Sequence, residues 1–166
     1  AILRIGAPAS VGIPPMVDWS DDIAAVAVDS AIIGGGFEYD GKRLAEFDEA
    51  ACRAFFEGVK GKVGAVAISC VFSGVRNDDE LAAAKIAREV LGDDVHVSIS
   101  SEIGSMGLVE RENATILNAA LVTVAKTTSE SFVAALAAEG IEDAEVYLCQ
   151  NDGTLMSAAY AMRYPI

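Results

Sequence analysis

Residues Val63 to Phe72 read VGAVAISCVF, an almost unbroken apolar run with the length of a strand. A strand that is apolar on both faces is typical of a parallel sheet with helices on either side. Residues 77–91 follow with apolar side chains at helical spacing, Asn77 as predicted N-cap and Glu80 in the position of a capping box. A second strand is predicted over residues 95–101. The strand–helix–strand order predicts a right-handed parallel βαβ unit.

The alternation of helices and strands extends in both directions from this unit. Asp40-Gly41 lies between extended segments 31–33 and 43–47 and predicts a type I′ hairpin. Further helices are predicted over residues 20–28, 48–59, 108–139 and 154–163, and further strands over residues 2–9 and 145–150. The predicted class is therefore α/β, with a mixed sheet built from parallel βαβ units and an N-terminal hairpin.

The regularity of the pattern changes near residue 48. Residues 1–47 form an extended, helical and hairpin segment, whereas residues 48–166 form a regularly alternating core. This core is either one truncated domain or parts of two. Because the chain starts at Ala1 without a methionine and stops at Ile166 without a tail, we expect a fragment, either natural or cloned.

Charge and cysteine content narrow the function classes. With 12 Lys+Arg against 25 Asp+Glu, the net charge of the 166 residues is −13, which disfavours nucleic-acid and membrane-surface partners. No apolar run of membrane-spanning length and no signal peptide are found. Cys52, Cys70 and Cys149 form no C-x-x-C pair, so we expect reduced thiols and a cytoplasmic location.

Two polar clusters follow predicted strands, where open α/β sheets bind ligands. In the first, Arg111, Thr115 and Asn118 fall at i, i+4 and i+7, so they share one helix face. They could hold a carboxylate or a cyclic amide, or they could tie helices together. In the second, residues 150–154 read QNDGT and open a predicted helix, whose N-terminus could bind an anion. The alternative is a turn followed by Thr154 as N-cap.

These segments together resemble the hydantoinase/oxoprolinase family, specifically its hydantoinase A-type subunit. The matching stretches are LRIGAP (3–8), IPPMVDW (13–19), FEYDG (37–41), SSEIG (100–104), ERENATILNAA (110–120) and QNDGTLM (150–156). The last two stretches are the most specific ones, and the resemblance covers nearly the whole chain.

The resemblance implies an enzyme that opens a five-membered cyclic amide, such as a hydantoin or 5-oxoproline, at the expense of ATP. ATP would phosphorylate the amide oxygen, which makes the ring carbonyl carbon open to attack by water. The implied fold is that of the actin and sugar-kinase ATPases, which is similar to ribonuclease H. Related subunits belong to ATP-dependent ketone carboxylases, and many members work with a second subunit of the hydantoinase B type.

The family's phosphate-binding motif, Asp-x-Gly-Gly-Thr, is not found in this sequence. ATP and Mg²⁺ are therefore expected in the full-length parent and not on this fragment, which should be inactive alone. No catalytic residue and no metal ligand is assigned. The resemblance favours a substrate-facing or subunit-facing role for Glu102, Arg111, Asn113, Thr115, Asn118, Asn151, Asp152, Gly153 and Thr154. A non-catalytic docking domain is the alternative, and exposed edges left by truncation could pair into a homo-oligomer.

Overall fold

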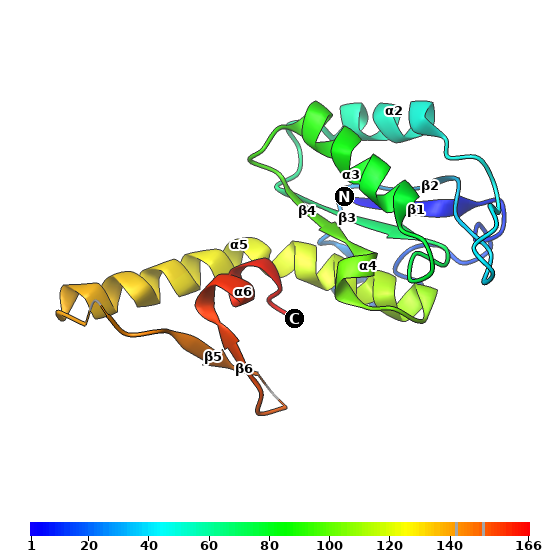
Figure 1. The fold of residues 1–166 in the computed structure, drawn as a ribbon. Helices are drawn as coiled ribbons and strands as arrows, with labels where there is room; N and C mark the ends of the chain where they lie inside the picture. The colour runs from blue at the N-terminus through cyan, green and yellow to red at the C-terminus, as the bar shows by residue number, and fades with distance from the viewer. Residues whose placement is uncertain (142, 151) are drawn as a thin grey trace. The chain divides into compact units, whose positions relative to one another are not determined.

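The computed structural model describes residues 1–141, 143–150 and 152–166 (Figure 1). The chain divides into two compact units, Ala1–Ala119 and Ala120–Ile166. The change in sequence pattern near residue 48 falls inside the first unit. Within the described ranges, no helix combines the length and the apolar composition that a bilayer span requires.

A four-stranded parallel sheet forms the centre of the first unit. Its strands are β1 (Ile2–Ala7), β2 (Ser30–Gly34), β3 (Ala65–Cys70) and β4 (His96–Ile99), and their order in the sheet is β2-β1-β3-β4. Ile5 of β1 pairs with Ile33 of β2 and with Cys70 of β3, so the carboxyl ends of these strands meet at one edge. The predicted α/β class with parallel βαβ units is confirmed.

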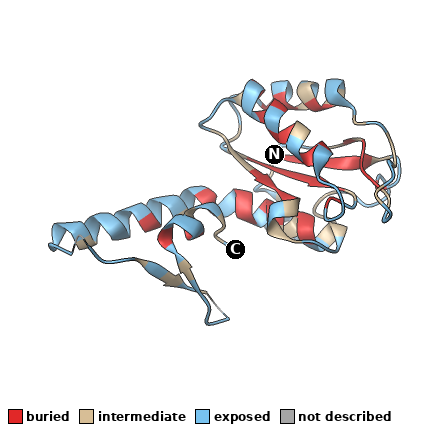
Figure 2. Cartoon of the chain, viewed as in Figure 1, coloured by how far each residue is buried: buried red, intermediate tan, exposed pale blue. Residues whose placement is uncertain are grey.

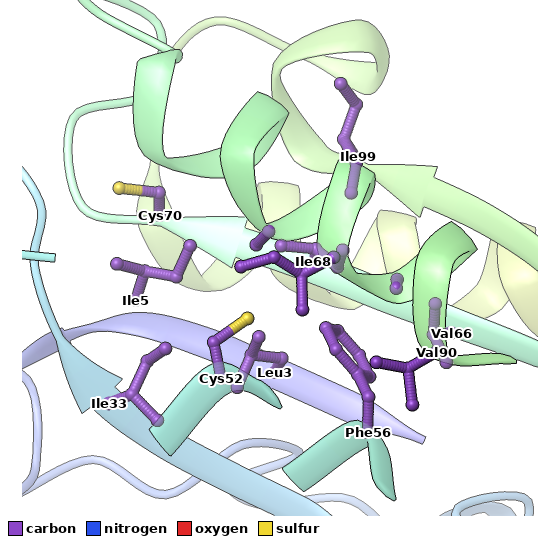
Figure 3. Packing of buried hydrophobic residues seen from close by; sticks show 14 of the residues in the cluster. Leu3, Ile5, Ile33, Cys52, Phe56, Val66, Ile68, Cys70, Val90 and Ile99 are labelled. Carbon is purple, nitrogen blue, oxygen red and sulfur yellow. The ribbon is translucent and has the colours of Figure 1, made fainter. Parts of the chain in front are cut away.

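One face of this sheet is covered by two helices that pack against each other, α2 (Glu49–Val59) and α3 (Asp78–Leu91). Asp48 caps α2 by accepting a hydrogen bond from the amide of Ala51 at 2.9 Å. Figure 3 shows the core beneath these helices, to which the labelled residues Leu3, Ile5, Ile33, Cys52, Phe56, Val66, Ile68, Cys70, Val90 and Ile99 contribute. The shorter α1 (Asp21–Ala24) connects β1 to β2.

The opposite face of the sheet is also covered, as the apolar run at Val63 to Phe72 predicts. Ile2 and Ala67 of the sheet pack against Ile116 and Ala119 of α5 (Leu108–Ala138). The buried residues of the first unit concentrate in the sheet and on the helix faces toward it, whereas α5 beyond residue 119 is largely exposed (Figure 2). A short helix, α4 (Ser100–Ile103), links β4 to the segment before α5.

The predicted N-terminal hairpin is wrong in its pairing. Residues 31–33 lie in β2, which pairs parallel with β1, and residues 37–43 share only a single antiparallel bridge. A type I′ turn needs positive φ at both central residues, yet of the pair Asp40-Gly41 only Gly41 has it, at 81°. The sheet of the first unit is consequently parallel and not mixed.

The second unit contains the hairpin that the structure does form. Its strands β5 (Tyr147–Cys149) and β6 (Leu155–Ser157) are antiparallel, and α6 (Ala158–Arg163) follows directly. The prediction that residues 145–150 form a parallel strand and that a helix starts at Thr154 is therefore wrong. The short loop allows local pairing, which costs less chain entropy than a crossover, and Ser157 caps α6 through the amide of Tyr160.

The three thiols should differ sharply in reactivity. Burial raises the pKa of the Cys52 thiol to about 12 and raises that of Cys70 further, whereas Cys149 is exposed. Since the thiolate is the reactive form, iodoacetamide at pH 8 should label only Cys149 in the folded chain and all three thiols in denaturant. Mass spectrometry counts the labels, and Cys149→Ser should abolish native labelling. Rapid native labelling of Cys149→Ser would contradict the buried placement of the other two thiols.

Candidate functional site

A buried ion pair joins the first strand to the long helix. Arg4 of β1 donates from Nε to Oε2 of Glu112 at 2.7 Å, and its Nη2 bonds to Oε1 of the same carboxylate. Ser69 of β3 donates to Oε2 of Glu112 at 2.6 Å. All three residues are 1% exposed. The bidentate, charge-assisted geometry provides the partners that two buried charges require.

The same arginine also holds the segment after β1. Arg4 Nη1 donates to the carbonyl oxygen of Ser10 at 3.3 Å and to that of Ile13. Every nitrogen of the guanidinium therefore has an acceptor, and the loop that follows β1 is fixed to the sheet and to α5 through one side chain.

A second network lies at the carboxyl ends of β3 and β4 and centres on Ser100. Arg111 of α5 donates from Nε to Ser100 Oγ at 2.8 Å, and from Nη2 to the carbonyl oxygen of Cys70 at 2.7 Å. Ser100 in turn donates to the carboxylate of Glu80, which also accepts from the amide of Ser101 at 2.9 Å. The serine hydroxyl thus links a buried guanidinium to a buried carboxylate.

Glu80 does not form the predicted capping box. Its carboxylate is fully buried and accepts from Ser100 and Ser101, and Asn77 makes no side-chain cap on α3. The physical reason is that two donors after β4, the Ser100 hydroxyl and the Ser101 amide, bind the carboxylate instead. A buried carboxylate gains more from these donors than from the amide at an exposed helix start.

Of the other predicted residues of α5, Thr115 and Asn118 are fully buried. Thr115 donates to the carbonyl oxygen of Arg111 at 2.6 Å, and Asn118 donates to Ser98 Oγ of β4 at 3.0 Å. Asn113 has a buried amide oxygen with no hydrogen-bond partner among the described residues. The hydrogen bonds of Arg111 and Asn118 join α5 to the end of β3, to Ser100 and to β4, and contact of this cluster with a ligand stays a prediction.

The remaining predicted residues belong to other parts of the sequence than α5. Glu102 is exposed on α4. Asp152, Gly153 and Thr154 form the turn between β5 and β6, and hydrogen bonds from the Thr154 amide and hydroxyl hold the pKa of Asp152 below its ordinary value. Asn151 lies outside the described residues. Within the second unit, Asp152 also lines a cavity of about 510 Å³.

A cavity of about 450 Å³ opens in the first unit at the carboxyl ends of the strands. One wall comes from Val71, Phe72 and Val75 after β3, and another from Met106 and Leu108 at the start of α5. Tyr39 and Arg111 complete the lining. Its volume and apolar walls are typical of small-molecule sites, and its place agrees with the usual ligand position in open α/β sheets.

Two backbone features shape this cavity. Phe72 has a positive φ of 53°, a conformation that is costly for a bulky residue and that is found disproportionately at functional sites. Gly74 lies so close to the segment before α5 that a Cβ there would overlap the carbonyl oxygen of Ser105. The segments that form the two walls are therefore in close backbone contact.

The lining does not fit a triphosphate. Among the described residues around the cavity, Arg111 is the only charged one, and each of its nitrogens donates to a protein acceptor: Ser100, Cys70 and Gly107. No group of three potential metal ligands is found in the described part of the chain.

The first unit is an α/β fold with a parallel sheet and a cavity at the carboxyl edge of that sheet. A family model described as the hydantoinase/oxoprolinase N-terminal region matches residues 10–91. The match over this segment is consistent with a fragment of a member of the hydantoinase/oxoprolinase family. No curated protein matches the chain significantly.

Sequence reasoning missed the buried partners in both networks: Arg4, Ser69 and Glu112 in the first, and Ser100 and Glu80 in the second. The signal was present, because Arg4 stands between Leu3 and Ile5 in a strand that must be covered on both faces. A buried cation needs an acid, and an acidic residue on the covering helix is the natural candidate.

The Arg4–Glu112 pair should show strong coupling in a double-mutant cycle. Arg4→Met or Glu112→Leu alone should lower the free energy of unfolding by about 3–5 kcal/mol, since each leaves a buried charge unpaired. The double variant should lose less than the sum. The exposed pair Arg53–Glu89, at 2.9 Å, is the matched control, and its cycle should give a coupling of about 1 kcal/mol or less.

Urea unfolding followed by circular dichroism measures all seven proteins of the two cycles, which share the unsubstituted chain. Additive losses at the Arg4–Glu112 pair, or equal coupling in both pairs, would show that the buried pair does not act as a unit.

Proposed function

We propose that the full-length protein containing this chain opens a five-membered cyclic amide by hydrolysis, and that the reaction consumes ATP. The family match supports the reaction class. The observation that carries the proposal is the cavity, because Tyr39, Phe72 and Val75, which line it, fall inside the matched segment. Its volume accommodates a five-membered ring with a short substituent.

In this proposal the chain binds and orients the ring. The apolar walls exclude water from the ring faces, and the Arg111 network fixes the start of α5 against the ends of β3 and β4. ATP and Mg²⁺ would be held by residues other than those of this cavity. A hydantoin and 5-oxoproline are the two substrate types, and a ketone undergoing ATP-dependent carboxylation is the related alternative.

The test uses the full-length protein with ATP and Mg²⁺, and follows both ring opening and phosphate release. Val75→Trp fills the cavity and should lower kcat/KM for ring opening by roughly tenfold or more while the melting temperature is kept. Val28→Trp, at an equally exposed valine that does not line the cavity, should leave kcat/KM unchanged.

Three results would contradict the proposal. The first is the absence of ring opening with hydantoin and with 5-oxoproline. The second is ketone carboxylation with bicarbonate in place of ring opening, which would favour the carboxylase alternative. The third is an equal effect of both tryptophan substitutions, which would separate the activity from this cavity.

A docking function is the second candidate, and a specific observation favours it. Beyond residue 119, α5 carries the exposed residues Leu121, Val124 and Phe132 along one helix face. We propose that this face binds a second subunit of the hydantoinase B type. Contiguous exposed apolar side chains of this kind commonly mark protein interfaces.

Val124→Lys and Phe132→Lys should each weaken the complex with the B-type subunit by about tenfold or more, since each places an ammonium in an apolar contact. Thr123→Lys, which is exposed on another side of α5, should not. Analytical ultracentrifugation of the two subunits measures the complex and also detects self-association. An intact complex in Val124→Lys and Phe132→Lys would exclude this face, and their loss of a homo-oligomer would assign it to a second copy of the chain.

A further inference from the structure

Among the described residues that line the cavity at the carboxyl ends of β3 and β4, one side chain is cationic. That side chain already donates hydrogen bonds to other groups of the protein. Arg111 is 4% exposed, and its Nε, Nη1 and Nη2 donate to Ser100, Gly107 and Cys70. A ligand carboxylate would have to displace these contacts to gain a bidentate partner. Arg111 therefore acts as part of the wall and not as an anchor for an anion.

The N-terminus of α5 is the second feature that could attract an anion to the cavity, because helix N-termini carry partial positive charge. Here the chain supplies its own anion. The carboxylate of Glu110 folds back against Gly107, so closely that a Cβ at Gly107 would overlap Glu110 Oε2. Gly107, with φ of 71°, makes room for it. A second carboxylate at this position would be repelled.

The remaining lining favours apolar groups. Phe72, Val75 and Met106 line the cavity and are all exposed, with Met106 86% exposed. Covering such side chains with a hydrocarbon substituent removes apolar surface from water, whereas covering them with a carboxylate desolvates a charge without a partner. The net charge of −13 adds a long-range repulsion of anions.

We infer that this cavity receives an uncharged, apolar substituent of the cyclic amide and discriminates against a carboxylate. The inference rests on the proposed ring-opening function and makes it more specific. The substrate class is then a hydantoin with a hydrocarbon group on its ring carbon. 5-Oxoproline, whose ring bears a carboxylate, is excluded because Arg111 and the N-terminus of α5 are already occupied by groups of the protein.

Two hydantoins of nearly equal size test this discrimination in the full-length protein. In 5-isobutylhydantoin the ring carries a branched hydrocarbon, and in hydantoin-5-acetic acid a carboxylate takes the place of the terminal isopropyl group. With ATP and Mg²⁺, kcat/KM for ring opening should be at least about tenfold higher for the isobutyl compound. 5-Oxoproline serves as a third probe and should react as poorly as the acetic acid derivative.

A charge placed in the cavity should reverse the preference. Val75 is half exposed, so Val75→Arg should fold, and its guanidinium should move the ratio of the two kcat/KM values toward the acid by about tenfold or more. Val75→Met controls for side-chain length without charge. Val28→Arg adds the same charge away from the cavity and controls for the change in net charge.

The outcomes separate this inference from the function on which it rests. The expected result is ring opening with a preference for the isobutyl compound. Only Val75→Arg should change this preference toward the acid. Ring opening with equal or preferred turnover of the acid by the unsubstituted protein overturns the inference and leaves the proposed function standing. If Val28→Arg changes the ratio of the two kcat/KM values as much as Val75→Arg does, the inference is also overturned. The preference would then not come from the cavity. Failure to open any of the rings overturns both.

Discussion

The packing of the first unit depends on the buried pair between Arg4 and Glu112. A bidentate guanidinium–carboxylate contact with both partners 1% exposed leaves little freedom in register or tilt for the helix that carries Glu112. Hydrophobic contact alone, such as that of Ile2 with Ile116, is compatible with small sliding of a helix on a sheet. The ion pair therefore adds specificity of placement, whereas most of the stabilisation comes from the apolar core on the other face of the sheet.

That placement determines the next residue along α5. Because Glu112 is fixed over β1 and β3, Arg111 reaches the carbonyl oxygen of Cys70 and the hydroxyl of Ser100. Glu80 compensates the guanidinium through Ser100, so two pairs of buried charges lie side by side along the same turn of α5. The start of the helix is held at the strand ends in this way, and one wall of the cavity is formed by Met106 and Leu108. The geometry of the candidate site is a consequence of the ion pairs beneath it.

The sequence predicts the alternation of helices and strands well, because periodicity reports which faces are buried. It does not predict which strands pair. Asp-Gly occurs at residues 40–41 and at residues 152–153, and only the second pair lies in the loop between two adjacent antiparallel strands. Near residues 40–41, β2 pairs with β1 instead. Arg43, just after this Asp-Gly, forms an ion pair with the buried Asp79, with 3.1 Å between Nη1 and Oδ1. Whether an Asp-Gly pair forms a hairpin depends on whether the flanking strands pair with each other or with distant segments of the chain. A single sequence does not show which distant segments will pair with them.

The polar residues of α5 show why the site is harder to predict than the fold. Spacing places Arg111, Thr115 and Asn118 on one helix face. A face with this spacing could bind a ligand or pack against a sheet equally well. The deciding fact is that β1, β3 and β4 each place a polar side chain on the covered face: Arg4, Ser69 and Ser98. Polar groups enclosed between a sheet and a helix must find partners, so the helix has to present matching groups at that depth. A polar residue inside an otherwise apolar strand therefore predicts a polar residue on the helix above it. The side chains left for a ligand are those at the strand ends, where the helix begins.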